Sequence, residues 1–199
     1  ILEMLRSKVK WLDVSSGGEI RRGLNAGYLR DSITFSGPGK REYELQFAVD
    51  NQIGEVICES LYEMELLNEI AATRNYVMPF LIRINPRSVP KYFGASMSGR
   101  VSQFGVDEEV VEIVLDRVKR LANLEFRGFH IYSASNSLRP ESIADNFMIF
   151  IEIFKKISRK KHVTPRKLVF GSGFGIPYHQ NEQALNLKKV ADLVNPMID

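Results

Sequence analysis

The stretch Leu168-Val-Phe-Gly-Ser-Gly-Phe-Gly-Ile-Pro-Tyr178 decides the fold that we expect for this chain. Its three apolar residues are typical of a buried strand and lead directly into a turn with Gly171, Gly173 and Gly175, which stops at Pro177. A glycine-rich turn exposes its backbone N–H groups, and such donors after a strand can bind a phosphate dianion. Turns of this kind also serve as plain connections. The stretch therefore predicts a strand followed either by a phosphate site or by a simple turn.

The residues before this stretch repeat the same order of strand, loop and helix. Two helix starts carry sequences typical of a capping box, Ser16-Gly-Gly-Glu19 and Ser60-Leu-Tyr-Glu63, in which the glutamate is expected to reach back to the N–H of the serine. The spacing of about twenty residues per repeat fits a (β/α) barrel or a doubly wound sheet of parallel strands. We predict parallel strands, in sequential barrel order, near Trp11–Val14, Ile33–Phe35, Val56–Cys58, Phe80–Ile84, Phe129–Tyr132 and Leu168–Phe170.

The composition is that of one globular domain. The chain has 199 residues, of which 44% are hydrophobic and 26% charged, so it is long enough to bury a full core. Its net charge of +3 lacks the dense positive charge of a nucleic-acid binder. Cys58 is the only cysteine, which indicates a reducing compartment, the cytoplasm. Because the net charge is small, we expect no nucleic acid as partner. Because no apolar run reaches membrane-spanning length, we expect no membrane as partner either.

Two segments interrupt the regular pattern. Residues 85–105 contain glycines, prolines and serines without periodicity, which predicts a long loop at the C-terminal end of a strand. Barrels keep their chemistry at that end, so the loop is a functional candidate, with disorder as the alternative. The chain also opens at Ile1 inside an amphipathic segment, and we therefore expect further residues upstream.

Polar residues recur at or just past the C-terminal ends of the predicted strands. In a barrel, such positions converge on one site. Each has a structural alternative: Asp13 or Glu19 could cap a helix, Arg83 could pair with a structural carboxylate, and His130 could be a core residue. No metal site is expected. The candidate positions are Asp13, Glu19, Arg83, His130, Ser133, Gly171, Ser172 and Gly173.

Several motifs follow one another in an order and at spacings that, taken together, are highly specific. They are Asp13-Val-Ser-Ser-Gly-Gly-Glu19, Phe35-Ser-Gly-Pro-Gly-Lys40, Glu59-Ser60, Leu81-Ile-Arg-Ile-Asn-Pro86, Gln103-Phe-Gly-Val106, Gly128-Phe-His-Ile131 and Gly171-Ser-Gly-Phe-Gly-Ile-Pro-Tyr178. Through them the chain resembles the fold-type III pyridoxal-phosphate decarboxylases, which include diaminopimelate, ornithine and arginine decarboxylases. The loop from Met97 to Val106, with Gln103 where diaminopimelate decarboxylases usually have lysine, is more similar to the branch of carrier-protein-linked glutamyl decarboxylases.

The resemblance implies roles for individual residues. His130 matches the histidine that stacks on the pyridine ring of the cofactor, and Ser133 matches the serine near its phosphate. Gly171 to Gly173 match the phosphate-binding turn, with Ser172 in place of a glycine. Asp13, Glu19 and Arg83 match polar residues around the cofactor. One departure affects Ser133, because Tyr132-Ser-Ala-Ser135 differs from the usual His-x-Gly-Ser sequence.

The resemblance also implies a fold and an activity. Residues 1–199 would form an incomplete (β/α)8 barrel of the alanine-racemase type that binds pyridoxal 5'-phosphate and lacks the first strand and the C-terminal β-domain. The reaction would be decarboxylation of an amino acid or a carrier-protein-bound aminoacyl substrate through imine and quinonoid intermediates, in a homodimer. The imine-forming lysine would lie before Ile1, so that Lys40 is not that lysine and the chain alone is inactive.

Two alternatives remain open. One is a racemase of the same fold, against which the decarboxylase-like Ser36-Gly-Pro-Gly-Lys40 argues. The other is a relative without catalytic activity that binds a protein partner.

Overall fold

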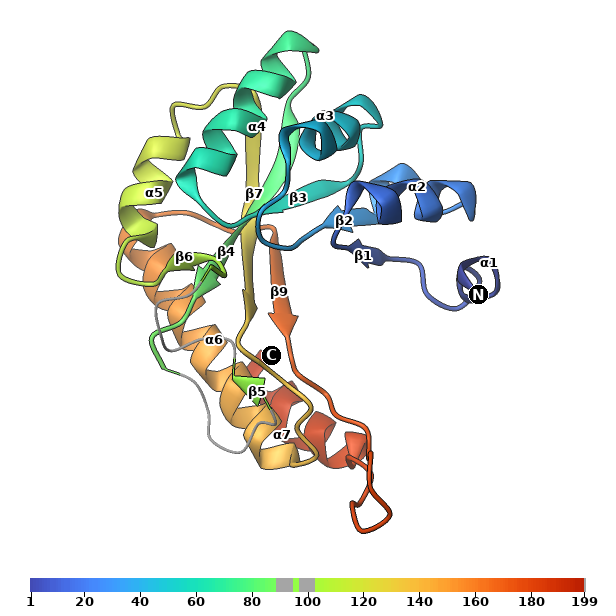
Figure 1. The fold of residues 1–199 in the computed structure, drawn as a ribbon. Coiled ribbons are helices and arrows are strands. Elements are labelled where there is room, and N and C mark those ends of the chain that lie inside the picture. The colour runs from blue at the N-terminus through green and yellow to red at the C-terminus, as the bar shows by residue number, and fades with distance from the viewer. Residues whose placement is uncertain (89–94, 97–102, 199) are drawn as a thin grey trace. The chain divides into compact units, whose positions relative to one another are not determined.

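The computed structural model describes residues 1–88, 95–96 and 103–198 (Figure 1). They fall into two compact units. The first unit contains Ile1–Arg83 and Ile113–Gly128, and the second contains Ile84–Glu112 and Phe129–Asp199. Strands β4 (Met78–Asn85) and β7 (Leu124–Tyr132) each begin in the first unit and end in the second.

The first unit alternates strands and helices as the sequence predicts. Its strands stand in the order β1-β2-β3-β4-β7, and β1 to β4 pair in parallel, with Leu12 opposite Ile33 and Val56 opposite Phe80. A doubly wound sheet would reverse this order, so the sequential arrangement favours the barrel. The elements are α1 (Leu2–Leu5), β1 (Leu12–Val14), α2 (Gly17–Asn25), a 3-10 turn (Arg30–Ser32), β2 (Ile33–Phe35), α3 (Glu42–Asp50), β3 (Glu55–Cys58), α4 (Leu61–Thr73), β4, most of α5 (Val111–Val118) and the start of β7.

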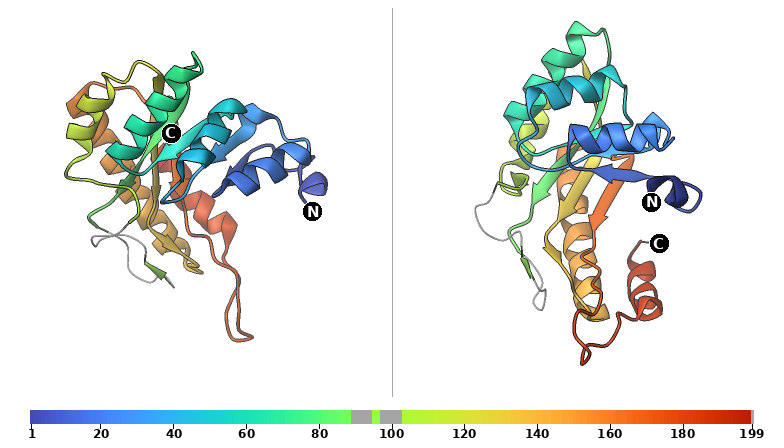
Figure 2. Two further views of the ribbon diagram at one scale, coloured as in Figure 1. Left: turned by 45° about the horizontal axis from the view of Figure 1, so that its top comes forward. Right: turned by 45° about the vertical axis from the view of Figure 1, so that its right-hand side comes forward.

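Helices shield one face of these strands from water. Every residue of β2, β3 and β4 is buried, as expected for strands of a parallel sheet. Helices α2, α3 and α4 lie next to one another in chain order along these strands (Figure 2). This packing leaves the carboxyl ends of the strands and the loops after them to carry polar side chains.

The two predicted capping boxes are present with one correction. Ser16 Oγ accepts from the Glu19 N–H, and Ser60 Oγ accepts from the Glu63 N–H, as predicted. The glutamates, however, accept from the residue before the serine: Ser15 N–H for Glu19 at 2.7 Å and Glu59 N–H for Glu63 at 3.2 Å. Both serines have an extended backbone, which turns the preceding N–H toward the glutamate.

The second unit is organised around one long helix. Helix α6 (Pro140–Lys161) packs its apolar face on β7 and β9 (Lys167–Gly171), with the rings of Phe129 and Phe154 stacked at 5.7 Å and those of Phe147 and Phe170 at 4.9 Å. Helix α7 (Leu187–Ile198) covers α6 through Val190 and Val194 (Figure 1). Strand β9 lies next to β7.

Three short strands complete this unit. Strand β6 (Val106–Asp107) pairs in parallel with the end of β4, and β5 (Ala95–Ser96) pairs in antiparallel fashion with β8 (Ala134–Ser135). Much of the loop predicted over residues 85–105 lies outside the described residues. Within the described part of the chain, no helix is long and apolar enough to cross a membrane.

Candidate active site

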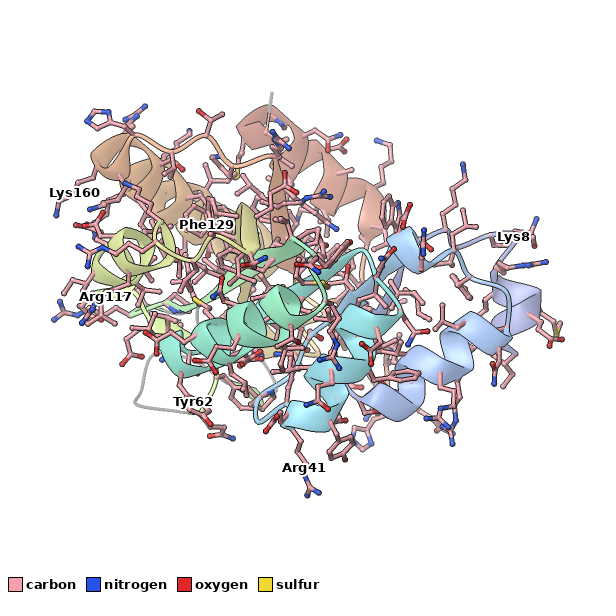
Figure 3. The ribbon with its side chains drawn as sticks, turned by 90° about the horizontal axis from the view of Figure 1, so that it is seen from above. Lys8, Arg41, Tyr62, Arg117, Phe129 and Lys160 are labelled. Atoms are coloured by element: carbon pink, nitrogen blue, oxygen red, sulfur yellow. The ribbon has the colours of Figure 1, made fainter. Side chains whose placement is uncertain are left out.

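His130 lies near the end of β7, on the face opposite α6. Its neighbour Phe129 stacks on Phe154 of α6, and side chains alternate along a strand, so His130 projects to the other side. Phe129 is fully buried among the packed side chains, whereas Arg41 and Tyr62 point outward (Figure 3). His130 itself is 5% exposed. The strand therefore holds the imidazole in a fixed, mostly desolvated position.

Ser133 follows β7 and is fully buried. Its hydroxyl donates to Asn146 Oδ1 of α6 at 2.7 Å. A phosphate oxygen needs a donor, so Ser133 can bind one only if its hydroxyl turns away from Asn146. The amide Nδ2 of Asn146 is buried and has no hydrogen-bond partner among the described residues. Asn146 is not among the residues predicted from the sequence, although a polar residue beside the apolar face of α6 was a signal for it.

The glycine turn follows β9 and lies against the end of β7. A Cβ atom on Gly171 would be 2.3 Å from Tyr132 Cδ2 and 2.8 Å from the Ile131 carbonyl oxygen, so only glycine fits there. Gly171 thus makes room for the ring of Tyr132. Gly173 has a φ of +70°, which other residues rarely adopt.

The turn has the donors that a phosphate needs. The Gly173 carbonyl accepts from the Ser137 N–H at 2.9 Å, and the Gly175 N–H donates to the Ser137 carbonyl at 3.0 Å. Within the described residues, the N–H groups of Ser172 and Gly173 donate to no protein acceptor. Both residues are only partly buried. The turn is therefore fixed in shape by Ser137 and keeps adjacent N–H groups for an anion.

In the first unit, Arg83 forms a buried ion pair with Glu59. Arg83 lies on β4, and its Nη1 is 2.9 Å from Oε1 of Glu59, which lies just after β3. The two side chains are 7% and 4% exposed. A buried guanidinium paired in this way has a fixed orientation.

Asp13 and Glu19 are less enclosed. Asp13 is an exposed residue of β1, and Glu19 is an exposed residue of α2 whose carboxylate accepts from the Ser15 N–H. Of the predicted positions, the second unit brings together His130, Ser133 and the turn from Gly171 to Gly173. The first unit carries Asp13, Glu19 and Arg83.

A second buried ion pair, which the sequence analysis did not predict, joins Lys40 to Glu63 at 2.6 Å. Burial raises the pKa of the Glu63 carboxyl, and the nearby Lys40 ammonium opposes that rise. Cys58 lies close by, and burial raises the pKa of its thiol well above the ordinary value. The thiol therefore stays protonated and inert near neutral pH.

Comparison with known proteins gives matches along the whole chain. Residues 1–199 match the family described as "Pyridoxal-dependent decarboxylase, pyridoxal binding domain". L-glutamyl-[BtrI acyl-carrier protein] decarboxylase of Niallia circulans is 33% identical over 190 residues, which are 94% of this chain and 44% of that protein. 2-[(L-alanin-3-ylcarbamoyl)methyl]-2-hydroxybutanedioate decarboxylase of Staphylococcus aureus is 30% identical over 178 residues, 89% of this chain and 44% of that protein.

A solved structure matches the fold. Diaminopimelate decarboxylase from Helicobacter pylori, complexed with L-lysine, superposes with a TM-score of 0.86 at 28% identity, over 98% of this chain and 49% of that one. With the sequential parallel strands, this match confirms the predicted fold as part of a (β/α)8 barrel. The chain spans about half the length of the relatives it matches.

Proposed function

The chain belongs to the pyridoxal-dependent decarboxylases, and from this we propose that the full-length protein removes the carboxylate of an amino acid or of a carrier-bound aminoacyl group. The observation that carries the proposal is the match of all 199 residues to the pyridoxal-binding domain of that family. The cofactor is pyridoxal 5'-phosphate. The relative from Niallia circulans confirms the resemblance to the carrier-linked branch.

Two features of the second unit fit this cofactor. The Ser172 and Gly173 N–H groups would hold its phosphate dianion, because adjacent backbone donors in a rigid turn suit such a charge. The His130 imidazole, fixed on the face of β7 away from α6, would pack on one side of the pyridine ring. When bound, pyridoxal phosphate supplies the electron sink for the electron pair of the broken bond between Cα and the carboxylate.

The polar residues of the first unit are further candidates for contacts with the cofactor. Arg83, held by Glu59, would supply a fixed positive charge beside the cofactor, and Asp13 and Glu19 would add carboxylates at the end of β1. Ser133 would donate a hydrogen bond to the phosphate once its hydroxyl no longer donates to Asn146. We also propose that residues 1–199 form part of one barrel domain and that the full-length protein is a cytoplasmic homodimer.

The names of two relatives support a substrate class. The relative from Niallia circulans is named for an L-glutamyl group on an acyl-carrier protein, and the relative from Staphylococcus aureus for an L-alanin-3-yl group linked to a hydroxybutanedioate. We therefore place carrier-bound aminoacyl groups first and free amino acids second.

The assay that tests this function incubates the full-length protein and pyridoxal phosphate with a panel of free and carrier-bound amino acids. Carbon dioxide and the matching amine are expected in equal amounts. Inversion at Cα without carbon dioxide would instead identify a racemase. A protein that fails to bind pyridoxal phosphate would overturn the proposal in favour of a non-catalytic, partner-binding relative.

We predict that the lysine linked to the cofactor lies outside residues 1–199. Lys40 is an unsuitable candidate, because its Nζ already donates to the Gly37 and Ile57 carbonyls and to Glu63. Borohydride reduction of the full-length protein with bound pyridoxal phosphate, followed by peptide mapping, identifies the lysine. A reduced adduct on Lys40, or on any other lysine within residues 1–199, would contradict the prediction.

We predict that Gly173→Val weakens binding of pyridoxal phosphate to the full-length protein by about tenfold or more, because a β-branched residue does not keep a positive φ and the turn must rearrange. Gly27→Val is the matched control, since Gly27 has a similar φ of +82° at the end of α2. Fluorescence titration measures both affinities. If both variants bind the cofactor as the unmodified protein does, the turn is only a connection.

A further inference from the structure

Lys40 is the centre of a buried polar contact in the first unit. Its side chain is 1% exposed, and the ammonium donates to the Gly37 carbonyl at 2.8 Å, the Ile57 carbonyl at 2.6 Å and Glu63 Oε1 at 2.6 Å. An ammonium has three protons, so all its donors are used. Lys40 thereby ties the loop after β2, which contains Gly37, to the end of β3 and the start of α4.

Glu63 also forms a hydrogen bond with Glu59. While one carboxylate oxygen of Glu63 accepts from Lys40, the other accepts from the backbone N–H of Glu59 at 3.2 Å. The side chain of Glu59 then pairs with Arg83 at 2.9 Å. Hydrogen bonds thus link Lys40 to Glu63 and Glu63 to the backbone of Glu59, and the Glu59 side chain connects that backbone to Arg83.

These four side chains form a balanced set of charges, two positive and two negative, and all are buried. Buried ion pairs contribute little net stability compared with apolar residues of similar size, because both charges lose their hydration. The linkage of two such pairs at adjacent strand ends therefore favours a role in fixing side-chain geometry over a role in net stability.

We propose that Lys40 and Glu63 are positioning residues that hold Glu59, and through it Arg83, at the carboxyl ends of β3 and β4. The inference rests on the proposed function, since Arg83 affects the reaction only if it borders the cofactor. Neither Lys40 nor Glu63 touches Arg83 directly in the contacts described above; both act through Glu59.

The test is Glu63→Gln in the full-length protein. Glutamine has one acceptor oxygen and places an N–H₂ group against either the Lys40 ammonium or the Glu59 N–H, both of which are donors. Binding of pyridoxal phosphate is expected to weaken by about tenfold, a size common for residues within one hydrogen-bond network. Glu65→Gln is the matched control on the same helix, because Glu65 is exposed, and it should leave the affinity unchanged.

A double-mutant cycle separates positioning from general stabilisation. If Glu63 acts through Arg83, then Glu63→Gln should change cofactor affinity little once Arg83→Met is present. Additive effects of the two substitutions would overturn the inference. Should Glu63→Gln fold poorly, Lys40→Met combined with Glu63→Met removes both charges and leaves neither uncompensated. This variant should fold and still bind the cofactor weakly; normal affinity would also overturn the inference.

Two separate measurements distinguish failure of this inference from failure of the proposed function. Failure of the unmodified protein to bind pyridoxal phosphate would reject that function, and the positioning claim would then be decided on melting temperatures of the cofactor-free protein. Non-additive shifts for Glu63→Gln and Arg83→Met would support the linked network. Additive shifts would reject it.

Discussion

Replacing His130 with alanine in the full-length protein is expected to lower kcat by on the order of 100-fold, which corresponds to about 2.7 kcal/mol of activation free energy. The fold is expected to survive, because His130 projects from β7 away from the aromatic packing with α6. The imidazole would be lost as the surface that holds the cofactor ring. Steady-state rates and a melting curve for the same preparation measure the two effects separately.

Phe129→Ala is the contrasting variant, one residue away on the opposite face. Phe129 is fully buried and stacks on Phe154, so its truncation should cost about 3–5 kcal/mol of unfolding free energy. The kcat per folded molecule should change much less than in His130→Ala. If His130→Ala instead destabilises the protein and keeps its kcat per folded molecule, His130 is a core residue and its assigned role is wrong.

Arg83→Met is expected to destabilise the protein by about 3–5 kcal/mol, because it leaves the Glu59 carboxylate buried without its partner charge. Denaturant unfolding of the cofactor-free protein measures this loss. Arg74→Met is the control: its pair with Asp50 is exposed, with side chains 39% and 50% accessible, and such pairs contribute at most about 1 kcal/mol.

Combining Arg83→Met with Glu59→Met should recover most of the stability, since no charge is then left unpaired. It should not recover cofactor affinity, because the positive charge beside the cofactor is still missing. Full recovery of both properties would show that the pair has only a structural role. An Arg83→Met protein as stable as Arg74→Met would show that Glu59 is not buried as described.

The strands of three or more residues were predictable because each has a local signal. Strands such as Ile33–Phe35 and Glu55–Cys58 are short apolar runs followed by a turn or a helix cap, and burial on both faces requires such runs in a parallel sheet. Strands β5 and β6 were not predicted. Each has only two residues, too few for any periodicity, and is held by pairing with a distant segment.

The site was predictable in its residue types more than in its contacts. Glycines after a strand and a histidine within an apolar strand are visible in the sequence, and the structure places His130 and Gly171 together in the second unit. The contact that makes Gly171 necessary comes from Tyr132, far away in the chain. The pairing of Lys40 with Glu63 likewise joins residues after different strands, which no local pattern reveals.

The most direct measurement for the central claim is a crystal structure of the full-length protein with bound pyridoxal phosphate. We expect a phosphate within hydrogen-bond distance of the Ser172 and Gly173 N–H groups and a pyridine ring stacked on His130. A cofactor whose phosphate binds elsewhere, with no ring contact to His130, would contradict it.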